Sequence, residues 1–174
     1  MQTPTLQTER LTLRLGQLSD AQDIYDTWTS DPEVAKYMRW NAHASVNETT
    51  EFLTHTINNA AGPKAFDWIF ISKETGKPIG SGGIFWHDGY SMFELGYCLA
   101  QKYWRQGFAA EASVAIMDFA RCELGAKEFF AEHVKENVGS GKVLQKLGFV
   151  YDSDGEYSTF DGKTTFKSCN YFLR

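Results

Sequence analysis

Apolar and polar residues follow two different periods along the chain, and these periods predict where strands and helices lie. Residues 8–15 alternate apolar and polar side chains, which is typical of a strand with one buried face. Two helices are expected next, each opened by a capping box, one at Ser19 with Gln22 and one at Ser45 with Glu48. The period of two then returns in three segments separated by turn residues, which predicts an antiparallel meander over residues 66–72, 79–86 and 90–100.

A long helix is predicted after the meander, because residues 107–124 place apolar side chains on one face at helical spacing. Gly125 then supplies the left-handed stop that a helix end favours. The next apolar segment, residues 128–135, is interpreted as a strand. Since a crossover helix separates it from the strand at 90–100, the two strands should run parallel.

The last part of the chain adds a helix capped by Asn137 and two strands at residues 149–157 and 164–173. No internal repeat, linker or low-complexity segment interrupts this order. We therefore expect one α/β domain, residues 1–174. It should be built on a single mixed, mostly antiparallel sheet with helices on both faces.

Composition narrows the class of protein. Of the 174 residues, 43% are hydrophobic and 15% aromatic, which argues against disorder. The formal charge of −5 argues against tight sequence-independent binding to nucleic acid, and no apolar run approaches the roughly 20 residues of a membrane span. Three widely spaced cysteines fit neither a disulfide framework nor a zinc site. The N-terminus has no export pattern, so we expect a cytoplasmic protein. His43, His87 and His133 have no partner at ligand spacing, so we expect no metal.

The segment from Trp104 to Ala110 is the clearest candidate site, because it connects a predicted buried strand to the start of the long helix. Unpaired N–H groups and the positive end of the helix dipole converge at such a junction and attract anions. Gly107 and Ala109 have no bulky side chain to keep a phosphate from the backbone. Lys102 and Arg105 add positive charge, so we expect a phosphate-bearing ligand at this turn.

A second phosphate motif competes with this turn. Residues 139–142, Gly-Ser-Gly-Lys, look like the end of a phosphate-binding loop and leave a nucleotide-dependent function open. However, Val143 stands where a serine or threonine would hold magnesium, and Glu136 stands where the first glycine belongs. The nucleotide interpretation is therefore the weaker one.

Several segments match one family in the right order. They are TERLTLR at 8–14, DPEV at 31–34, ELGYCL at 94–99, YWRQGFAAEA at 103–112, NVGS at 137–140 and KLGF at 146–149. With these segments the chain resembles the GNAT acetyltransferase superfamily over nearly its whole length. Within it, the branch of Rim-type ribosomal-protein N-terminal (alanine/serine) acetyltransferases looks closest. Trp104 takes the place of the Arg or Gln that opens the family signature, a substitution familiar in this branch.

The resemblance implies acetyl-CoA as co-substrate. Its diphosphate would sit on the turn, and its pantetheine arm would lie between the two parallel strands, which splay apart at the centre of the sheet in this family. A backbone N–H near Cys98 or Leu99 would face the thioester oxygen. The residues expected to bind acetyl-CoA are Tyr97, Cys98, Leu99, Arg105, Gln106, Gly107, Phe108, Ala109, Ala110 and Asn137.

Acetyl transfer to an amine needs a base for the amine proton and a proton for the leaving thiolate. Glu94 and Glu132 lie on the two strands expected to splay, so either could be the base. By resemblance, Glu132 matches a glutamate base of one alanine N-acetyltransferase, and Ser140 matches a serine proposed to protonate the thiolate. Many GNAT proteins carry a tyrosine at the position of Leu144, and its absence shifts that role to Ser140.

The expected acceptor is a primary amine, and the resemblance favours a protein N-terminus attacked directly in a ternary complex. Alternatives are a small-molecule amine, such as a polyamine, an amino acid or an antibiotic, and a non-catalytic acyl-CoA-binding module. Trp40, Asn41, His43 and Trp86 could line the acceptor pocket. We expect a monomer or a homodimer, with no direct binding to nucleic acid or membrane.

Overall fold

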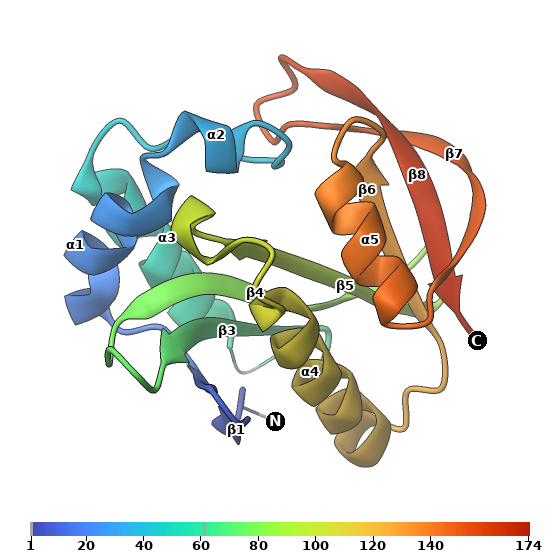
Figure 1. Ribbon diagram of the computed structural model, residues 1–174, viewed down its shortest axis with the longest axis horizontal. Helices are drawn as coiled ribbons and strands as arrows, with labels where there is room; N and C mark the ends of the chain where they lie inside the picture. Colours follow the sequence, from blue (N-terminus) through green and yellow to red (C-terminus); the bar gives the residue numbers. More distant parts are fainter. Residues whose placement is uncertain (1, 61) are drawn as a thin grey trace.

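The segments with a period of two become the strands of one sheet. The structure, a computed structural model, describes residues 2–60 and 62–174. Its strands are β1 (Leu6–Gln7), β2 (Leu11–Arg14), β3 (Ala65–Ser72), β4 (Pro78–His87), β5 (Met92–Leu99), β6 (Phe129–Val134), β7 (Val150–Ser158) and β8 (Thr165–Leu173). They lie in the order β1-β2-β3-β4-β5-β6-β8-β7, and β5 and β6 are the parallel neighbours in an otherwise antiparallel arrangement, as predicted (Figure 1).

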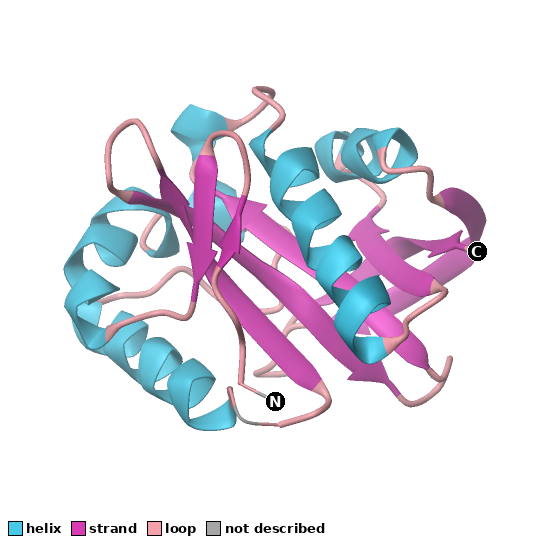
Figure 2. Cartoon of the chain, turned by 90° about the horizontal axis from the view of Figure 1, so that it is seen from below, coloured by secondary structure: helices cyan, strands magenta, loops and turns pink. Residues whose placement is uncertain are grey.

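Helices cover both faces of this sheet (Figure 2). They are the 3₁₀ turn η1 (Leu18–Asp20), α1 (Ala21–Ile24), its wider π-type continuation η2 (Tyr25–Thr29), α2 (Pro32–Ala35), α3 (Val46–Asn59), the 3₁₀ turn η3 (Gln101–Tyr103), α4 (Phe108–Leu124) and α5 (Val138–Lys146). In the described part of the chain, none of these helices has the length and apolar character needed to cross a membrane. The expected α/β fold with a mixed sheet is confirmed.

Alternation along the strands divides the buried side chains between two cores. On one side of the sheet, here called the α4 face, Phe66 and Trp68 of β3 pack edge-on against Phe119 of α4, with ring centroids 5.3 and 5.5 Å apart. On the other side, the α3 face, Ile69 of β3 shares a core with Leu53 of α3. Successive residues of a strand therefore belong to different sides of the protein.

The first strand is shorter than predicted. Residues 8–10 form a bend between β1 and β2 instead of continuing one strand. Glu111 of α4 explains the difference, because its Oε1 accepts hydrogen bonds from Thr8 Oγ1 at 2.5 Å and from the Arg10 peptide N–H at 2.8 Å. A carboxylate from a helix thus replaces a neighbouring strand as the partner of this segment.

The predicted capping boxes are only partly present. The first helical segment is capped by Gln17 and Asp20, since the Asp20 carboxylate accepts the Gln17 N–H at 2.8 Å, and the predicted Ser19–Gln22 box is wrong. Asp20 accepts this capping hydrogen bond because a carboxylate is a stronger acceptor than a hydroxyl or an amide. Ser45 is the N-cap of α3 as predicted, but its side chain makes no capping hydrogen bond.

β5 and β6 stay together for only two residue pairs, Phe93 with Phe129 and Glu94 with Phe130. Beyond these pairs β5 continues along β4, and β6 continues along β8. Peptide groups of residues 95–99 that face β6 therefore have no strand partner. We call this divergence the strand gap, and it confirms the splay that the family resemblance implies.

Candidate functional site

The turn between β5 and α4 leads into the first residues of α4. No side chain of the described residues caps this end of the helix. Gly107 is the N-cap, and its φ of 84° is a left-handed conformation that glycine adopts without strain. The N–H groups of Phe108, Ala109 and Ala110 follow at the positive end of a helix of 17 residues. N–H groups at such a helix start attract anions, so the turn has suitable geometry for the predicted phosphate site, which stays a prediction.

Arg10, in the bend that precedes β2, supports this turn. Its Nη1 donates to the Gln106 carbonyl at 3.0 Å, and its guanidinium lies 4.1 Å from the centre of the Phe108 ring. Its Nη2 lies 2.6 Å from the Glu111 carboxylate, one turn into α4. Burial raises the pKa of Glu111, but the hydrogen bonds from Thr8 and Arg10 outweigh it, so the net pKa lies below the usual value. Arg10 therefore fixes both sides of Gly107 in place.

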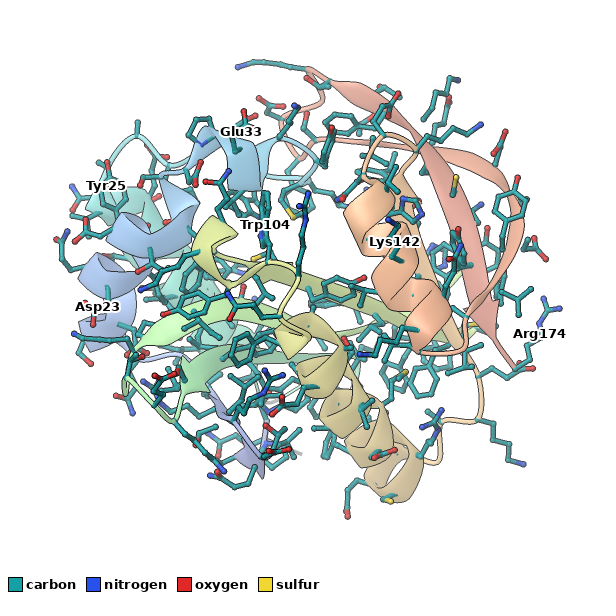
Figure 3. The ribbon with its side chains drawn as sticks, viewed as in Figure 1. Asp23, Tyr25, Glu33, Trp104, Lys142 and Arg174 are labelled. Atoms are coloured by element: carbon teal, nitrogen blue, oxygen red, sulfur yellow. The ribbon has the colours of Figure 1, made fainter. Side chains whose placement is uncertain are left out.

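Trp104 joins the turn to the end of β5. Its Nε1 donates to the Leu99 carbonyl at 2.7 Å, and the residue stays 41% exposed. Figure 3 shows its position at the junction. Arg105 follows in a left-handed conformation with φ of 61°. The Arg105 and Gln106 side chains are exposed, so both can reach a ligand on the turn.

The direction of the peptide groups at the end of β5 separates two candidates. The Ala100 N–H donates to the Ile79 carbonyl beside β4, and peptide groups alternate sides along a strand. Cys98 therefore directs its N–H toward β4, whereas Leu99 and Tyr97 direct theirs toward the strand gap. Of the two predicted donors, Leu99 has the suitable orientation.

Cys98 belongs to the core of the α3 face. Its thiol lies 3.4 Å from Ser81 Oγ, and burial raises the pKa of the thiol. A thiol held in the neutral form is a poor nucleophile. Cys98 therefore contributes apolar packing beneath the site.

Glu94 and Glu132 lie on the α3 face, because their chain neighbours Phe93 and Ala131 lie in the core of the α4 face. Burial raises the pKa of Glu94, and the negative charge of Glu132 raises it further. The positive charge of Arg39 opposes this shift without cancelling it. A carboxylate with a raised pKa next to an open strand edge is suited to accept a proton.

Glu132 is already paired. Its Oε1 forms an ion pair with Arg39 Nη2 from the loop between α2 and α3, and its Oε2 accepts a hydrogen bond from Ser168 Oγ at 3.2 Å. The Arg39 guanidinium also lies 4.3 Å from the centre of the Tyr157 ring. Burial and the charge of Glu132 raise the pKa of Tyr157 to about 12, and its hydroxyl donates to the Tyr37 carbonyl at 2.8 Å.

Ser140 lies in the first turn of α5, across the strand gap from β5. Its N–H donates to Asn137 Oδ1 at 3.2 Å, which is the predicted helix cap. Its Oγ lies 3.0 Å from the Tyr97 hydroxyl oxygen, and the Ser140 carbonyl oxygen lies 3.2 Å from it, so the single Tyr97 proton has two acceptors within reach. Burial raises the pKa of Tyr97. Leu144, one turn further, is only 1% exposed and packs in the core.

The loop between α2 and α3 contacts the hairpin that joins β7 to β8 (Figure 1). Asn41 Nδ2 donates to Asp161 Oδ2 at 2.9 Å, and the Phe160 N–H donates to the Arg39 carbonyl at 2.7 Å. Phe160 itself is 80% exposed at the hairpin tip. Two segments far apart in sequence thus meet beside Glu132.

The predicted acceptor residues do not all lie together. Trp40 and His43 are neighbours on the α3 face, with ring centroids 5.6 Å apart, and His43 Nδ1 lies 2.8 Å from Thr49 Oγ1. Burial lowers the pKa of His43. Trp86 instead lies on the α4 face, where it packs edge-on against Phe93 at 5.3 Å. It is therefore separated by the sheet from Trp40, Asn41 and His43.

Sequence reasoning assigned no role to two arginines that organise the site. Arg10 is 101 residues from Glu111, and Arg39 is 93 residues from Glu132, so no local pattern connects either pair. Arg10 does lie within the matched segment at 8–14, which is a weak signal. Among residues 2–60 and 62–174, no group of three or more His, Cys, Asp or Glu side chains is placed to hold a metal ion.

Comparisons with known proteins agree with this geometry. Residues 10–150 match the acetyltransferase (GNAT) domain family. The chain is 35% identical over 146 residues to an uncharacterized N-acetyltransferase, p20, of Bacillus licheniformis, which covers 83% of this chain and 82% of that protein.

Solved structures share the fold. A ribosomal-protein-S5-alanine acetyltransferase from Vibrio fischeri superposes with a TM-score of 0.81 at 19% identity, over 98% of this chain and 96% of that one. The microcin C7 self-immunity acetyltransferase MccE, in complex with acetyl-CoA and AMP, gives a TM-score of 0.81 at 16% identity, over 95% and 92% of the chains. At these identities the likeness concerns the fold alone. On the domain match and the relative from Bacillus licheniformis, the chain belongs to the GNAT family and is an N-acetyltransferase.

Proposed function

We propose that the protein transfers an acetyl group from acetyl-CoA to a primary amine by direct attack in a ternary complex, with residues 1–174 as one catalytic domain. The observation that carries this proposal is the strand gap, since β5 and β6 pair only at Phe93–Phe129 and Glu94–Phe130. A thioester can reach from the uncapped start of α4 into this gap. It then lies between the hydroxyls of Tyr97 and Ser140 on one side of the sheet and the carboxylates of Glu94 and Glu132 on the other.

The two sides of the sheet serve different substrates. Acetyl-CoA binds on the α4 face, with its diphosphate on the N–H groups after Gly107 and its pantetheine along the open edge of β5. The amine approaches from the α3 face, where Glu94, Glu132 and the loop around Arg39 lie. This division keeps the two reactants on opposite sides until they meet in the gap.

The reaction then uses groups already in position. The amine nitrogen attacks the thioester carbon, the C–N bond forms, and the electron pair of the breaking C–S bond leaves on sulfur. The Leu99 N–H donates to the carbonyl oxygen as negative charge develops, an interaction that can lower the barrier by about 3 kcal/mol. Ser140 Oγ donates a hydrogen bond to the departing thiolate, and a carboxylate takes the proton from the amine.

Glu94 is the better candidate for that carboxylate. Its pKa is raised by burial and by Glu132, which makes it a stronger base than an ordinary carboxylate. Glu132 forms an ion pair with Arg39 and accepts a hydrogen bond from Ser168, so its oxygen lone pairs are less available to accept a proton. An α-amino group has an ordinary pKa of about 8, so a base of modest strength is sufficient near neutral pH.

A protein N-terminus is the favoured acceptor. The fold likeness to a ribosomal-protein-S5-alanine acetyltransferase supports it, as does the family resemblance of the motifs. The exposed Phe160 ring at the β7–β8 hairpin offers an apolar contact to a chain that extends from the gap.

Thiol release from acetyl-CoA tests this proposal with two acceptor panels, peptides with free N-termini and small amines. We expect turnover with peptides that begin with a small residue and none with the same peptides blocked at the N-terminus. Turnover with small amines alone would replace the peptide acceptor. Tight acetyl-CoA binding without turnover on any acceptor would contradict the enzymatic proposal and favour a binding module.

A further inference from the structure

The Tyr97 hydroxyl reaches across the strand gap to the first turn of α5. It lies 3.0 Å from Ser140 Oγ and 3.2 Å from the Ser140 carbonyl oxygen. The ring of Tyr97 packs against the core of the α4 face, so the phenol approaches Ser140 from a fixed direction. From the other side, Asn137 holds the Ser140 N–H at 3.2 Å. Ser140 is thus positioned both through its peptide and through its side chain.

We propose that Tyr97 is a positioning residue that orients the Ser140 hydroxyl toward the leaving sulfur. This inference rests on the proposed function. A serine hydroxyl has one proton and can rotate, so by itself it can donate to a nearby carbonyl as readily as to a thiolate. Tyr97 also has one proton, which goes either to the Ser140 carbonyl or to Ser140 Oγ, the nearer of the two acceptors. When it goes to Ser140 Oγ, the serine proton is directed away from Tyr97. The gap, where the thiolate leaves, is then available to this proton.

The pair acts through hydrogen bonds and leaves both hydroxyls protonated. Burial raises the pKa of Tyr97, so the phenol keeps its proton throughout the neutral range. The C–S electron pair stays on sulfur and is stabilised by the Ser140 O–H, and the thiolate gains its proton from solvent after release. A hydrogen bond between polarised donors strengthens the next one in the chain, so Tyr97 makes Ser140 a better donor.

The residue one turn along α5 from Ser140 supplies no phenol. Leu144, one turn along α5 from Ser140, is 1% exposed and has no hydrogen-bond donor on its side chain. The phenol of Tyr97 instead comes from β5, the strand that carries Leu99 and Glu94. One rigid strand, β5, therefore carries three of the groups: the Leu99 N–H that faces the thioester oxygen, the base Glu94, and Tyr97, which orients Ser140.

A double-mutant cycle tests the inference with acetyl-CoA and an acceptor that the wild type uses. Tyr97→Phe keeps the ring and removes one hydroxyl, Ser140→Ala removes its partner, and the third variant combines both. We expect Tyr97→Phe to lower kcat about tenfold with little change in KM for acetyl-CoA, because a Ser140 hydroxyl that is no longer oriented stabilises the leaving sulfur less in the transition state. In the Ser140→Ala background the same substitution should change kcat less than twofold.

Tyr151→Phe is the matched control. Tyr151 is an exposed tyrosine of β7 whose hydroxyl donates to Asp154 at 3.1 Å, and its substitution should leave kcat unchanged. Melting temperatures and acetyl-CoA binding by calorimetry show that each variant is folded. The pH profile adds a second readout, because Tyr97→Phe should lower the rate by the same factor from pH 6 to 9.

Three results would overturn the inference. One is that Tyr97→Phe lowers kcat by the same factor in the wild-type and Ser140→Ala backgrounds, which would make the two residues independent. Another is an unchanged kcat for Tyr97→Phe in an active enzyme. The third is the loss of an alkaline limb in the pH profile, which would make Tyr97 a proton donor in its own right. An inactive wild type with every acceptor would instead contradict the proposed function and remove the basis of this inference.

Discussion

Arg39 and Glu132 form an ion pair that ties the loop between α2 and α3 to β6, beside the strand gap. The side chain of Arg39 is 37% exposed, whereas that of Glu132 is 11% exposed. The pair neutralises one of the two carboxylates beside the gap and leaves Glu94 uncompensated. Burial raises the pKa of Glu94, the charge of Glu132 raises it further and the charge of Arg39 lowers it, so this ion pair adjusts the pH range in which Glu94 is ionised.

Replacing Arg39 should move the pH dependence of catalysis. In Arg39→Gln the positive charge that lowers the pKa of Glu94 is lost, and that pKa rises further. The acidic limb of kcat/KM should therefore shift to higher pH, measured from pH 5 to 9. Stability should fall by about 1–3 kcal/mol in urea unfolding, because Glu132 loses its partner in a mostly buried place. Lys36→Gln, which breaks an exposed pair with Glu33, is the control and should change neither quantity. An unmoved acidic limb would contradict the electrostatic coupling.

Glu94 and Glu132 should differ as bases. Glu94→Gln removes the uncompensated carboxylate, and we expect kcat/KM to fall by about 10²–10⁴ as for loss of a general base. Glu132→Gln keeps Glu94 and should lower the rate by less than tenfold. Steady-state kinetics of both variants from pH 6 to 9 make the comparison. If both variants retain the full rate across this range, neither carboxylate is the base.

Gly107 and Gly125 provide a matched pair of backbone tests at the two ends of α4. Both have positive φ, 84° and 69°, so alanine should destabilise the fold by about 1 kcal/mol at either position. Only Gly107 borders the N–H groups proposed to hold the diphosphate. Calorimetry should therefore show weaker acetyl-CoA binding for Gly107→Ala and unchanged binding for Gly125→Ala. Equal affinities in the two variants would argue against the proposed diphosphate site.

Asp67 should make stability depend on pH. It lies on β3 opposite Gly83, and burial raises its pKa from 3.8 to about 6. Because the folded state disfavours the ionised form, stability is lost as the pH rises from about 4 through 6. The full difference corresponds to roughly 3 kcal/mol, of which Asp67→Asn should recover about 1–2 kcal/mol above pH 6.

Urea unfolding of Asp67→Asn and the wild type at pH 4.5 and 7.5 measures this effect. The variant should be more stable at pH 7.5 and nearly equal to the wild type at pH 4.5. Asp88→Asn is the control, because that carboxylate is exposed and its pKa is lowered by Lys64. A variant that is less stable at pH 7.5 would mean that the Asp67 carboxylate makes a stabilising interaction.

Local patterns were sufficient for most of the secondary structure. The meander over β3, β4 and β5, the long helix α4 and the parallel relation of β5 and β6 all follow from short-range periods and chain order. The wrong predictions concern short segments. The segment at 8–10 has the alternation of a strand, but Glu111 from α4 supplies its hydrogen bonds and bends it. A pattern cannot report a partner that lies about a hundred residues away.

The sequence by itself determined the strands, the helices and the glycine turn, because these depend on steric preferences and on the period of apolar residues within a few positions. Only the tertiary structure decided which candidates act together. It paired Glu132 with Arg39, oriented the Leu99 N–H toward the gap, set Tyr97 against Ser140 and placed Trp86 on the other side of the sheet from His43. The reason is that ionic pairing, desolvation and the face of a strand depend on which segments meet in space, and local composition does not record this.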